Sequence, residues 1–290
     1  MQTSLNIFPL TGILGARIEG LDLSSKITGE ELYSITEALQ KYEVLVIPDQ
    51  QLSPEQQVAF SHRLGPYSPV PFVKPIKEHD EVIKIVKEKT EPDAFNFGGV
   101  WHSDFSFLSH PPAFTILHAI EVPDFGGDTV WASTTAAYYY LDYETQEKLK
   151  KITALHSASA SYSPDQQDLH SKLSGMNIET SEKANETYEH PLICEHPASK
   201  KPSLFYNNTY VQGLNSPDFE TLKDEKKLMQ WLHKWTTDIK FTFRHKWSNG
   251  DVVIWDNRAT QHIALNDYKG QRREMNRTTV GSQQAPRLYK

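Results

Sequence analysis

The sequence has little cysteine and no long apolar run. Cys194 is the single cysteine among 290 residues, so no disulfide can form within the chain, which suits a reducing cytoplasm. No stretch approaches the roughly 18 apolar residues of a membrane span. The N-terminal residues also lack the basic start and apolar run of a secretory signal. We therefore expect a cytoplasmic protein without a membrane partner.

The chain also lacks a basic region. Its formal net charge is −7, and it contains no long run of lysine or arginine. Because proteins that bind nucleic acid carry a basic patch or stripe, a dedicated nucleic-acid surface is not expected. A local basic pocket for a small anion remains compatible with this charge. The expected partner is therefore a small molecule.

Internal repeats, low-complexity linkers and a regular alternation of strands and helices are absent too. A chain of 290 residues with 38% hydrophobic content can bury a sizeable core, and we treat residues 1–290 as one domain. Short segments rich in β-branched and aromatic residues predict strands at 42–48, 115–122, 128–132, 203–207 and 251–256. The expected fold class is mainly β with flanking helices (α+β), around a double-stranded β-helix of the jelly-roll, cupin-like type.

Three helices are indicated between these strands. Capping-box patterns that begin at Thr28 and at Ser53 predict the first two. A third is expected to follow Ser216-Pro217 and to run towards Trp235. Residues 157–201 differ, because they are polar and rich in turn-forming residues. Such a long connection predicts a lid or a binding loop, with disorder as the alternative.

The stretch "WHSDFSF", residues 101–107, places two polar side chains among aromatic ones. In a strand, His102 and Asp104 would point to the same face, as two metal ligands require. Buried polar groups are costly unless they are paired or bound to a metal. The alternative is a histidine hydrogen-bonded to its neighbour. Two ligands do not complete a site, so a third must come from elsewhere in the chain. A third ligand that is a histidine would give the two-histidine, one-carboxylate set of non-haem Fe(II).

A second motif lies near the C-terminus, where a predicted strand ends at "WDNR" and His262 follows. Arg273 comes eleven residues later, and Arg277 four residues after that. An arginine binds a carboxylate through two parallel hydrogen bonds, so this motif is typical of a metal ligand followed by an anion clamp. The alternative is a surface arginine pair that balances Asp267 and Glu274.

Taken together, the two motifs resemble the taurine/2-oxoglutarate dioxygenase (TauD/TfdA) family of Fe(II)/2-oxoglutarate-dependent oxygenases. The likeness extends over nearly the whole chain, through the ordered segments "PLTGILGARIEGLDLS", "VIPDQQLSPEQQ", "WHSDFSF", "PPAFTIL", "GGDTVWAS", "WDNRATQH" and "RREMNRTTV". Ordered matches of this kind are specific, whereas the His-x-Asp triplet alone is not.

The resemblance implies a role for each matching position. His102, Asp104 and His262 match the iron ligands, so they are the expected catalytic residues. Thr129 and Arg273 match the residues that hold the far carboxylate of the cosubstrate 2-oxoglutarate. The position of Arg277 contacts the cosubstrate or an anionic substrate in relatives. The implied activity is O2-dependent oxidation of an unactivated C–H bond in a small, anionic molecule, coupled to decarboxylation of 2-oxoglutarate to succinate and CO2.

The sequence departs from the pattern of members that oxidise taurine. Val70 stands where they carry a histidine that holds the sulfonate, and Gly98 stands where they carry an asparagine that contacts the amine. We therefore expect taurine to be a poor substrate. Further candidates for the substrate pocket, each of which is equally compatible with ordinary core packing, are Tyr67, Phe72, Asn96, Phe105, Phe205 and Tyr206. His110, His118, His156, His170, His190 and His196 are not expected to take part.

Two other functions remain open at this point. The same oxygenase class also performs desaturation and other oxidative tailoring in natural-product pathways. A jelly-roll protein that binds a metabolite without catalysis would keep the anion clamp but would not need an open iron site. Relatives are often homo-dimers or homo-tetramers, and no feature of this sequence decides the oligomeric state.

Overall fold

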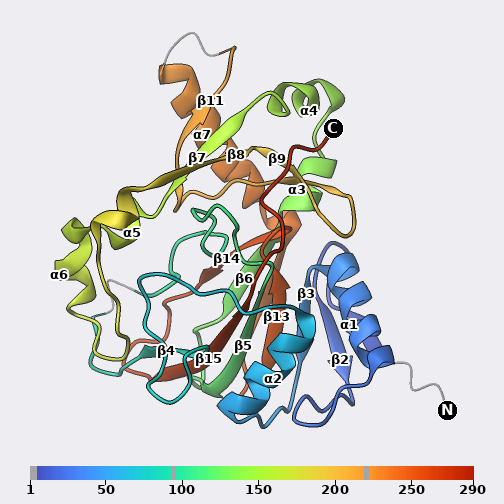
Figure 1. Ribbon diagram of the computed structural model, residues 1–290, viewed down its shortest axis with the longest axis vertical. Helices are drawn as coiled ribbons and strands as arrows, with labels where there is room; N and C mark the ends of the chain where they lie inside the picture. Colours follow the sequence, from blue (N-terminus) through green and yellow to red (C-terminus); the bar gives the residue numbers. More distant parts are fainter. Residues whose placement is uncertain (1–4, 93–95, 219–221) are drawn as a thin grey trace.

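A computed structural model describes residues 5–92, 96–218 and 222–290 of the chain (Figure 1). Its largest sheet has seven strands, which pair antiparallel except for the parallel pair β2–β3. In spatial order they are β1 (Asn6–Pro9), β2 (Ala16–Glu19), β3 (Val44–Ile47), β13 (Val252–Asp256), β5 (Phe114–Glu121), β15 (Arg273–Val280) and β4 (Ile83–Lys87). The structure is thus mostly sheet with some helices, as the sequence predicts.

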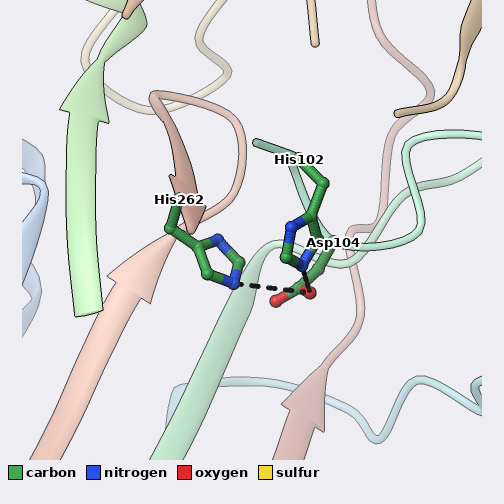
Figure 2. A group of neighbouring side chains, drawn as sticks. All are labelled: His102, Asp104 and His262. Carbon is green, nitrogen blue, oxygen red and sulfur yellow. Dashed lines mark ion pairs between the residues drawn. The ribbon is translucent and has the colours of Figure 1, made fainter. Parts of the chain in front are cut away.

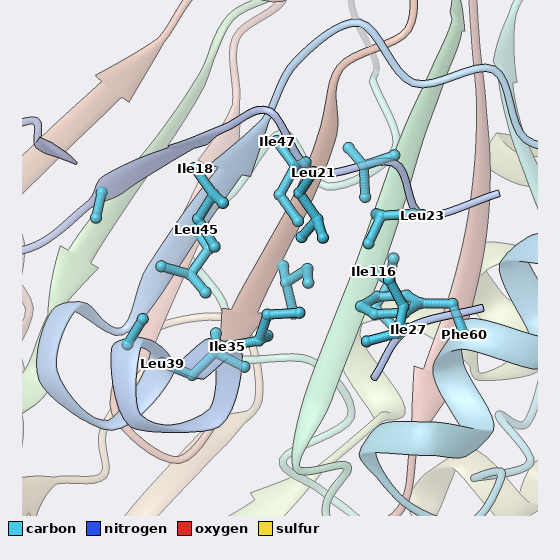
Figure 3. Close-up of a cluster of buried hydrophobic side chains, with 14 of the residues drawn as sticks. Ile18, Leu21, Leu23, Ile27, Ile35, Leu39, Leu45, Ile47, Phe60 and Ile116 are labelled. Atoms are coloured by element: carbon cyan, nitrogen blue, oxygen red, sulfur yellow. The ribbon is translucent and has the colours of Figure 1, made fainter. Parts of the chain in front are cut away.

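The central strands of this sheet are buried on both faces, which explains their continuous hydrophobic sequences. In β3, Leu45 and Ile47 face one cluster of buried side chains, and Val44 and Val46 face another. The first cluster is completed by helices α1 (Gly29–Tyr42) and α2 (Pro54–Leu64), as Figures 1 and 3 show. These helices therefore cover the face of the sheet opposite the candidate site.

The other face packs against a smaller sheet of β12 (Thr242–His245), β6 (Thr129–Ser133) and β14 (Thr260–Ala264). Trp131, Phe243 and Trp247 fill the space between the two sheets. Within this packing, Trp247 contacts both Thr129 at the start of β6 and Arg273 at the start of β15, and His262 lies in the middle of β14.

A third group of elements packs around its own apolar cluster, at the top of the view in Figure 1. It contains the sheet β11 (Val211–Asn215), β7 (Thr153–Ser157), β8 (Thr187–Pro191) and the pair β10 (Pro202–Leu204) and β9 (Ile193–Glu195). Helices α3 (Thr134–Tyr139), α4 (Tyr143–Leu149) and α7 (Leu222–Thr236) belong to the same group.

The predicted helix starts can be compared with the structure. Thr28 and Ser53 both form reciprocal capping boxes, which confirms α1 and α2. The predicted third helix is α7, and residues 219–221 of its expected beginning lie outside the described residues. The strand predicted at 203–207 is only partly correct, because β10 ends at Leu204. No helix in the described part of the chain is long and apolar enough to cross a membrane.

Residues 157–201 form short ordered elements rather than one long loop. These are α5 (Ser159–Tyr162), η1 (Pro164–Gln166), α6 (Gln167–His170) and η2 (Glu182–Asn185), followed by β8 and β9. Two contacts tie this segment to the rest of the chain near β4. Ile178 forms a bridge with Val73, and the Glu91 carboxylate accepts hydrogen bonds from the backbone N–H groups of Ser174 and Gly175 at 2.8 Å each.

Candidate metal and cosubstrate site

His102, Asp104 and His262 meet at one point, as Figure 2 shows. Their ligand atoms all lie within 4.8 Å of one another, and all three side chains are buried. His102 and His262 come together because their backbones form an antiparallel bridge. Each backbone N–H donates to the carbonyl oxygen of the other residue, with N to O distances of 3.0 Å for His102 N and 2.7 Å for His262 N. Residues 160 positions apart in the chain are therefore aligned by main-chain hydrogen bonds.

Asp104 reaches this point in a different way from the one the sequence suggests. His102 lies in an extended bridge, but a turn begins at Asp104, so the pair does not share one strand. Phe105 has φ of 49°, a left-handed backbone that is costly for a bulky residue. The turn, and not the alternation of a strand, brings the carboxylate to the two imidazoles.

Both imidazoles present Nε2 towards the Asp104 carboxylate, at 3.5 Å for His102 and 3.9 Å for His262. His102 Nδ1 lies 2.7 Å from the carbonyl oxygen of Val100. That hydrogen bond places the proton on Nδ1 and leaves the Nε2 lone pair free, as a metal ligand requires. Burial lowers the pKa of His262 well below its ordinary value, and the neighbouring His102 lowers it further. The His262 ring is therefore neutral at pH 7.

The two carboxylate oxygens of Asp104 have separate partners. Oδ1 faces the histidines, whereas Oδ2 accepts hydrogen bonds from Thr115 Oγ1 at 2.7 Å and pairs with Arg277 Nη2 at 3.0 Å. Burial alone would raise the pKa of Asp104, but the Arg277 guanidinium and the two imidazoles hold it well below the usual range. The carboxylate is therefore ionised and fixed in orientation, with one oxygen free to bind a cation.

Two neutral imidazole nitrogens and one carboxylate oxygen match the donor set of non-haem Fe(II) sites with open positions. Cys194, the single cysteine, is not part of this group, and its thiol donates to the carbonyl oxygen of Pro191. The residues present fit a bound Fe(II) ion.

A second polar group, Arg273, lies buried on β15. Its side chain is 5% exposed, and its Nε and Nη2 atoms have no hydrogen-bond partner among the described residues. The guanidinium lies over the Trp247 ring, 5.7 Å from the centroid, and the indole N–H of Trp247 donates to Thr129 Oγ1 at 3.0 Å. Because that oxygen accepts from Trp247, the Thr129 hydroxyl hydrogen remains for another acceptor. Arg273 and Thr129 thus provide unused donors suited to a carboxylate.

A cavity of about 280 Å³ opens beside the metal ligands. Of the predicted pocket residues, Asn96, Gly98, Phe105 and Arg277 line it together with His102 and Asp104. Gly98 has φ of 75°, and a Cβ there would lie 3.4 Å from His102 Cε1. A larger residue at this position would be strained by the positive φ, and its Cβ would lie in van der Waals contact with the His102 ring.

The structure places the other predicted pocket residues away from this cavity. Val70 and Phe72 pack in the apolar cluster behind Tyr162, and Tyr67 donates to the carbonyl oxygen of Asp80. Phe205 stacks on His156, and the Tyr206 hydroxyl donates to the carbonyl oxygen of Met229. All five lie outside the named strands, and tertiary contacts turn them away from the cavity.

Several cavity residues were not anticipated from the sequence. They come from two segments, 160–170 and 208–210, and are Ala160, Ser161, Tyr162, Gln166, Leu169, His170, Asn208, Thr209 and Tyr210. His170 has no partner at ligand spacing and is not expected from the sequence to take part, yet it lies in the cavity wall. The polar, turn-rich composition of 157–201 was the one available signal, and it identified the segment but not its individual residues.

Comparison with known proteins agrees with this geometry. The sequence model of the family described as "Taurine catabolism dioxygenase TauD, TfdA family" matches residues 6–279. An alkylsulfatase of Acinetobacter baylyi is 31% identical over 286 residues, which cover 96% of this chain and 86% of the relative. An alpha-ketoglutarate-dependent sulfate ester dioxygenase of Pseudomonas putida is 31% identical over 281 residues, covering 96% and 90%.

A solved structure gives the same picture in three dimensions. A putative alpha-ketoglutarate-dependent taurine dioxygenase from Burkholderia xenovorans superposes with a TM-score of 0.80 at 29% identity, covering 98% of this chain and 94% of that one. The family match includes the positions of His102, Asp104, His262 and Arg273. The chain belongs to the TauD/TfdA family of dioxygenases.

Proposed function

We propose that this chain is an Fe(II)- and 2-oxoglutarate-dependent dioxygenase that oxidises a C–H bond of a small organic anion. The observation that carries the proposal is the joint presence of two preformed but incomplete sites. One is the buried ligand set of His102, Asp104 and His262. The other is the buried guanidinium of Arg273, whose Nε and Nη2 lack partners in the described structure.

In this proposal His102, Asp104 and His262 hold the metal, while Arg273 and Thr129 bind the far carboxylate of 2-oxoglutarate. When bound, iron and 2-oxoglutarate supply the oxidation of a C–H bond by O2, coupled to decarboxylation of the keto acid to succinate and CO2. The chain contributes position and a dry environment. Phe105 and Phe107 are both buried beside the ligands and exclude water from the reacting groups.

Arg277 has two roles in this arrangement. It orients Asp104 through Oδ2 and also lines the cavity. Second partners that fix a ligand carboxylate commonly tune metal affinity. Arg277 thus links the metal ligand to whatever occupies the cavity.

The finer architecture is also part of the proposal. We infer that the seven-stranded sheet and the β12–β6–β14 sheet form a double-stranded β-helix of the jelly-roll, cupin-like type within one domain. Residues 157–201 act as a lid, since Ser161, Tyr162 and His170 of this segment close one wall of the cavity. A homo-dimer or homo-tetramer remains the expected assembly, and sedimentation velocity measures it.

The substrate class follows from the cavity and from the names of the relatives. The relatives with 31% identity are an alkylsulfatase and a sulfate ester dioxygenase, and Arg277 places a cation at the cavity wall. Val70, which aligns with the sulfonate-binding histidine of taurine oxidisers, does not line the cavity. Gly98, which aligns with their amine-binding asparagine, has no side-chain amide. An organic anion other than taurine, such as a sulfate ester, is therefore the proposed substrate class.

The test is succinate release from 2-oxoglutarate across a panel of organic sulfates, sulfonates and carboxylates, with and without Fe(II). Turnover is expected to need the metal and one of the organic anions. His102→Ala should abolish it, whereas His110→Ala is the control, because that histidine is exposed and hydrogen-bonds to the neighbouring Ser109. Full turnover by His102→Ala would overturn the iron assignment. Binding of 2-oxoglutarate without O2 consumption across the panel would favour the metabolite-binding alternative, and a product lighter than its substrate by two hydrogens would identify desaturation.

A further inference from the structure

Two tyrosines stand beside the ligand set in the cavity wall. Tyr162 ends α5 in the segment 157–201, and Tyr210 directly precedes β11. Both are buried, and both line the cavity. The Tyr210 ring meets the His102 ring edge-on, with 6.3 Å between centroids. Asp104 and Arg277 line the same cavity as the two phenols.

Aromatic neighbours fix the orientation of Tyr162. Its ring stacks on Phe72, with centroids 5.0 Å apart and planes 18° apart, and on His170, at 5.8 Å and 10°. The Phe107 ring packs against both tyrosines, with its centroid 6.3 Å from that of Tyr162 and 4.8 Å from that of Tyr210. Because the rings cannot rotate freely in this packing, each hydroxyl has a defined place in the cavity wall.

The two hydroxyls interact through a hydrogen bond in which either phenol can be the donor. Burial raises the pKa of Tyr162 to about 12, so this phenol keeps its proton at neutral pH. Burial raises the pKa of Tyr210 well above its ordinary value, and the hydrogen bond to Tyr162 adds to this effect. When Tyr210 donates to the Tyr162 oxygen, the Tyr162 O–H remains to donate to a third group.

An anion in this cavity needs such a donor. Among the described residues that line the cavity, Arg277 is the only lysine or arginine. Its charge is already shared with Asp104, at 3.0 Å. A neutral O–H that is held in place can complete the recognition of an oxyanion without adding a second buried charge. Phe97, Val100 and Leu169 supply apolar wall for the remainder of the molecule.

We propose that Tyr162 determines substrate specificity by donating its hydroxyl hydrogen to the oxyanion of the primary substrate, and that Tyr210 is a positioning residue that orients this hydroxyl. The substrate class is an oxyanion group, such as sulfate, sulfonate or carboxylate, on an apolar chain. This inference rests on the proposed function and deepens it, because it assigns the recognition of the anion to a side chain of the proposed lid.

The experiment measures equilibrium binding by calorimetry without O2, to the full chain loaded with Mn(II) and 2-oxoglutarate. Hexyl sulfate, hexanesulfonate and hexanoate are the probes. Tyr162→Phe keeps the stacked ring and removes only the hydroxyl, so it should bind the tightest probe about tenfold more weakly. Tyr210→Phe should lose less, and the double variant should bind no more weakly than Tyr162→Phe, because Tyr210 acts through Tyr162. Tyr139→Phe is the control, because Tyr139 is 77% exposed on α3 and does not line the cavity.

Several results would overturn the inference. They are unchanged affinity in Tyr162→Phe, additive losses in the double variant, and failure of the wild-type chain to bind any of the three probes. A merely structural role would lower the affinity for 2-oxoglutarate and the melting temperature of Tyr162→Phe as well, and that result would also count against it. Failure of the proposed function is distinguishable, since the wild-type chain would then not bind 2-oxoglutarate in the presence of Mn(II).

Discussion

Replacing Arg273 with methionine should stabilise the cofactor-free chain and at the same time remove most of its affinity for 2-oxoglutarate. Arg273 is 5% exposed, and its Nε and Nη2 atoms have no partner in the described structure. Burial lowers the pKa of its guanidinium, against the opposing effects of Tyr268 and Asp128. A buried charge that awaits a ligand costs folding free energy, and methionine has a similar length without the charge.

The sizes of the two effects can be estimated. Removing a poorly compensated buried charge should raise the free energy of unfolding by about 1–3 kcal/mol. With an unfolding entropy of roughly 0.6 kcal/mol/K for a chain of 290 residues, the melting temperature should rise by about 2–5 °C. Loss of a bidentate arginine–carboxylate contact should weaken 2-oxoglutarate binding by about 2–4 kcal/mol, which is roughly 30- to 1,000-fold.

Thermal unfolding with and without Mn(II) and 2-oxoglutarate measures both effects. At 100 times its Kd, the cosubstrate adds about 2.7 kcal/mol to the wild-type chain, and Arg273→Met should lose nearly all of that gain. Arg272→Met is the matched control on the adjacent position. Arg272 contacts Glu88, Glu121 and Glu274 at 2.5–3.1 Å, so this variant should lose about 1 kcal/mol of stability and keep the response to 2-oxoglutarate. An Arg273→Met chain that is less stable than the wild type, or that keeps the response, would refute the reasoning.

Three further predictions concern the proposed lid, the ligand set and a buried acid. Gly175→Ala should raise KM for the organic anion several-fold, because a Cβ there would lie 2.7–2.9 Å from Val86, including its backbone oxygen, and would push the proposed lid out of place. Steady-state kinetics measures this effect. An unchanged KM would show that the contact between Gly175 and Val86 does not hold the proposed lid. Thr115→Val removes the hydroxyl that donates to Asp104, so Mn(II) titration should show roughly 10- to 100-fold weaker metal binding; equal affinity would contradict the role of this hydrogen bond. Burial raises the pKa of Glu43 from 4.5 to about 7, so the folded state binds a proton that the unfolded state releases, and stability from this group is lost as pH rises through that window. Glu43→Gln should therefore flatten the fall in unfolding free energy between about pH 4.5 and 7, by up to about 3 kcal/mol, as urea unfolding at several pH values measures; parallel wild-type and variant curves would exclude this contribution.

The local features of the fold could be predicted from the sequence because each depends on a few neighbouring residues. The capping boxes at Thr28 and Ser53 are satisfied by side chains three positions away, and the central strands lie within two residues of the predicted segments. The extent of β10 and the turn at Asp104 were not predicted. In both cases tertiary contacts, namely the packing around β9 and the bridge between His102 and His262, override the local pattern.

By itself the sequence determined the kinds of group available for chemistry: two histidines and an aspartate in two short motifs, and arginines at fixed distances after the second. Such spacing is a property of short windows of chain, and the ordered motifs over the whole length match one family. Only the tertiary structure decided which side chains form the walls of the cavity. Tyr162 and Tyr210 meet beside His102 through packing between segments about 50 to 110 residues apart, and Phe205 turns away for the same reason. Long-range packing leaves no periodic trace in the sequence, so these residues could be recognised only once the chain was folded.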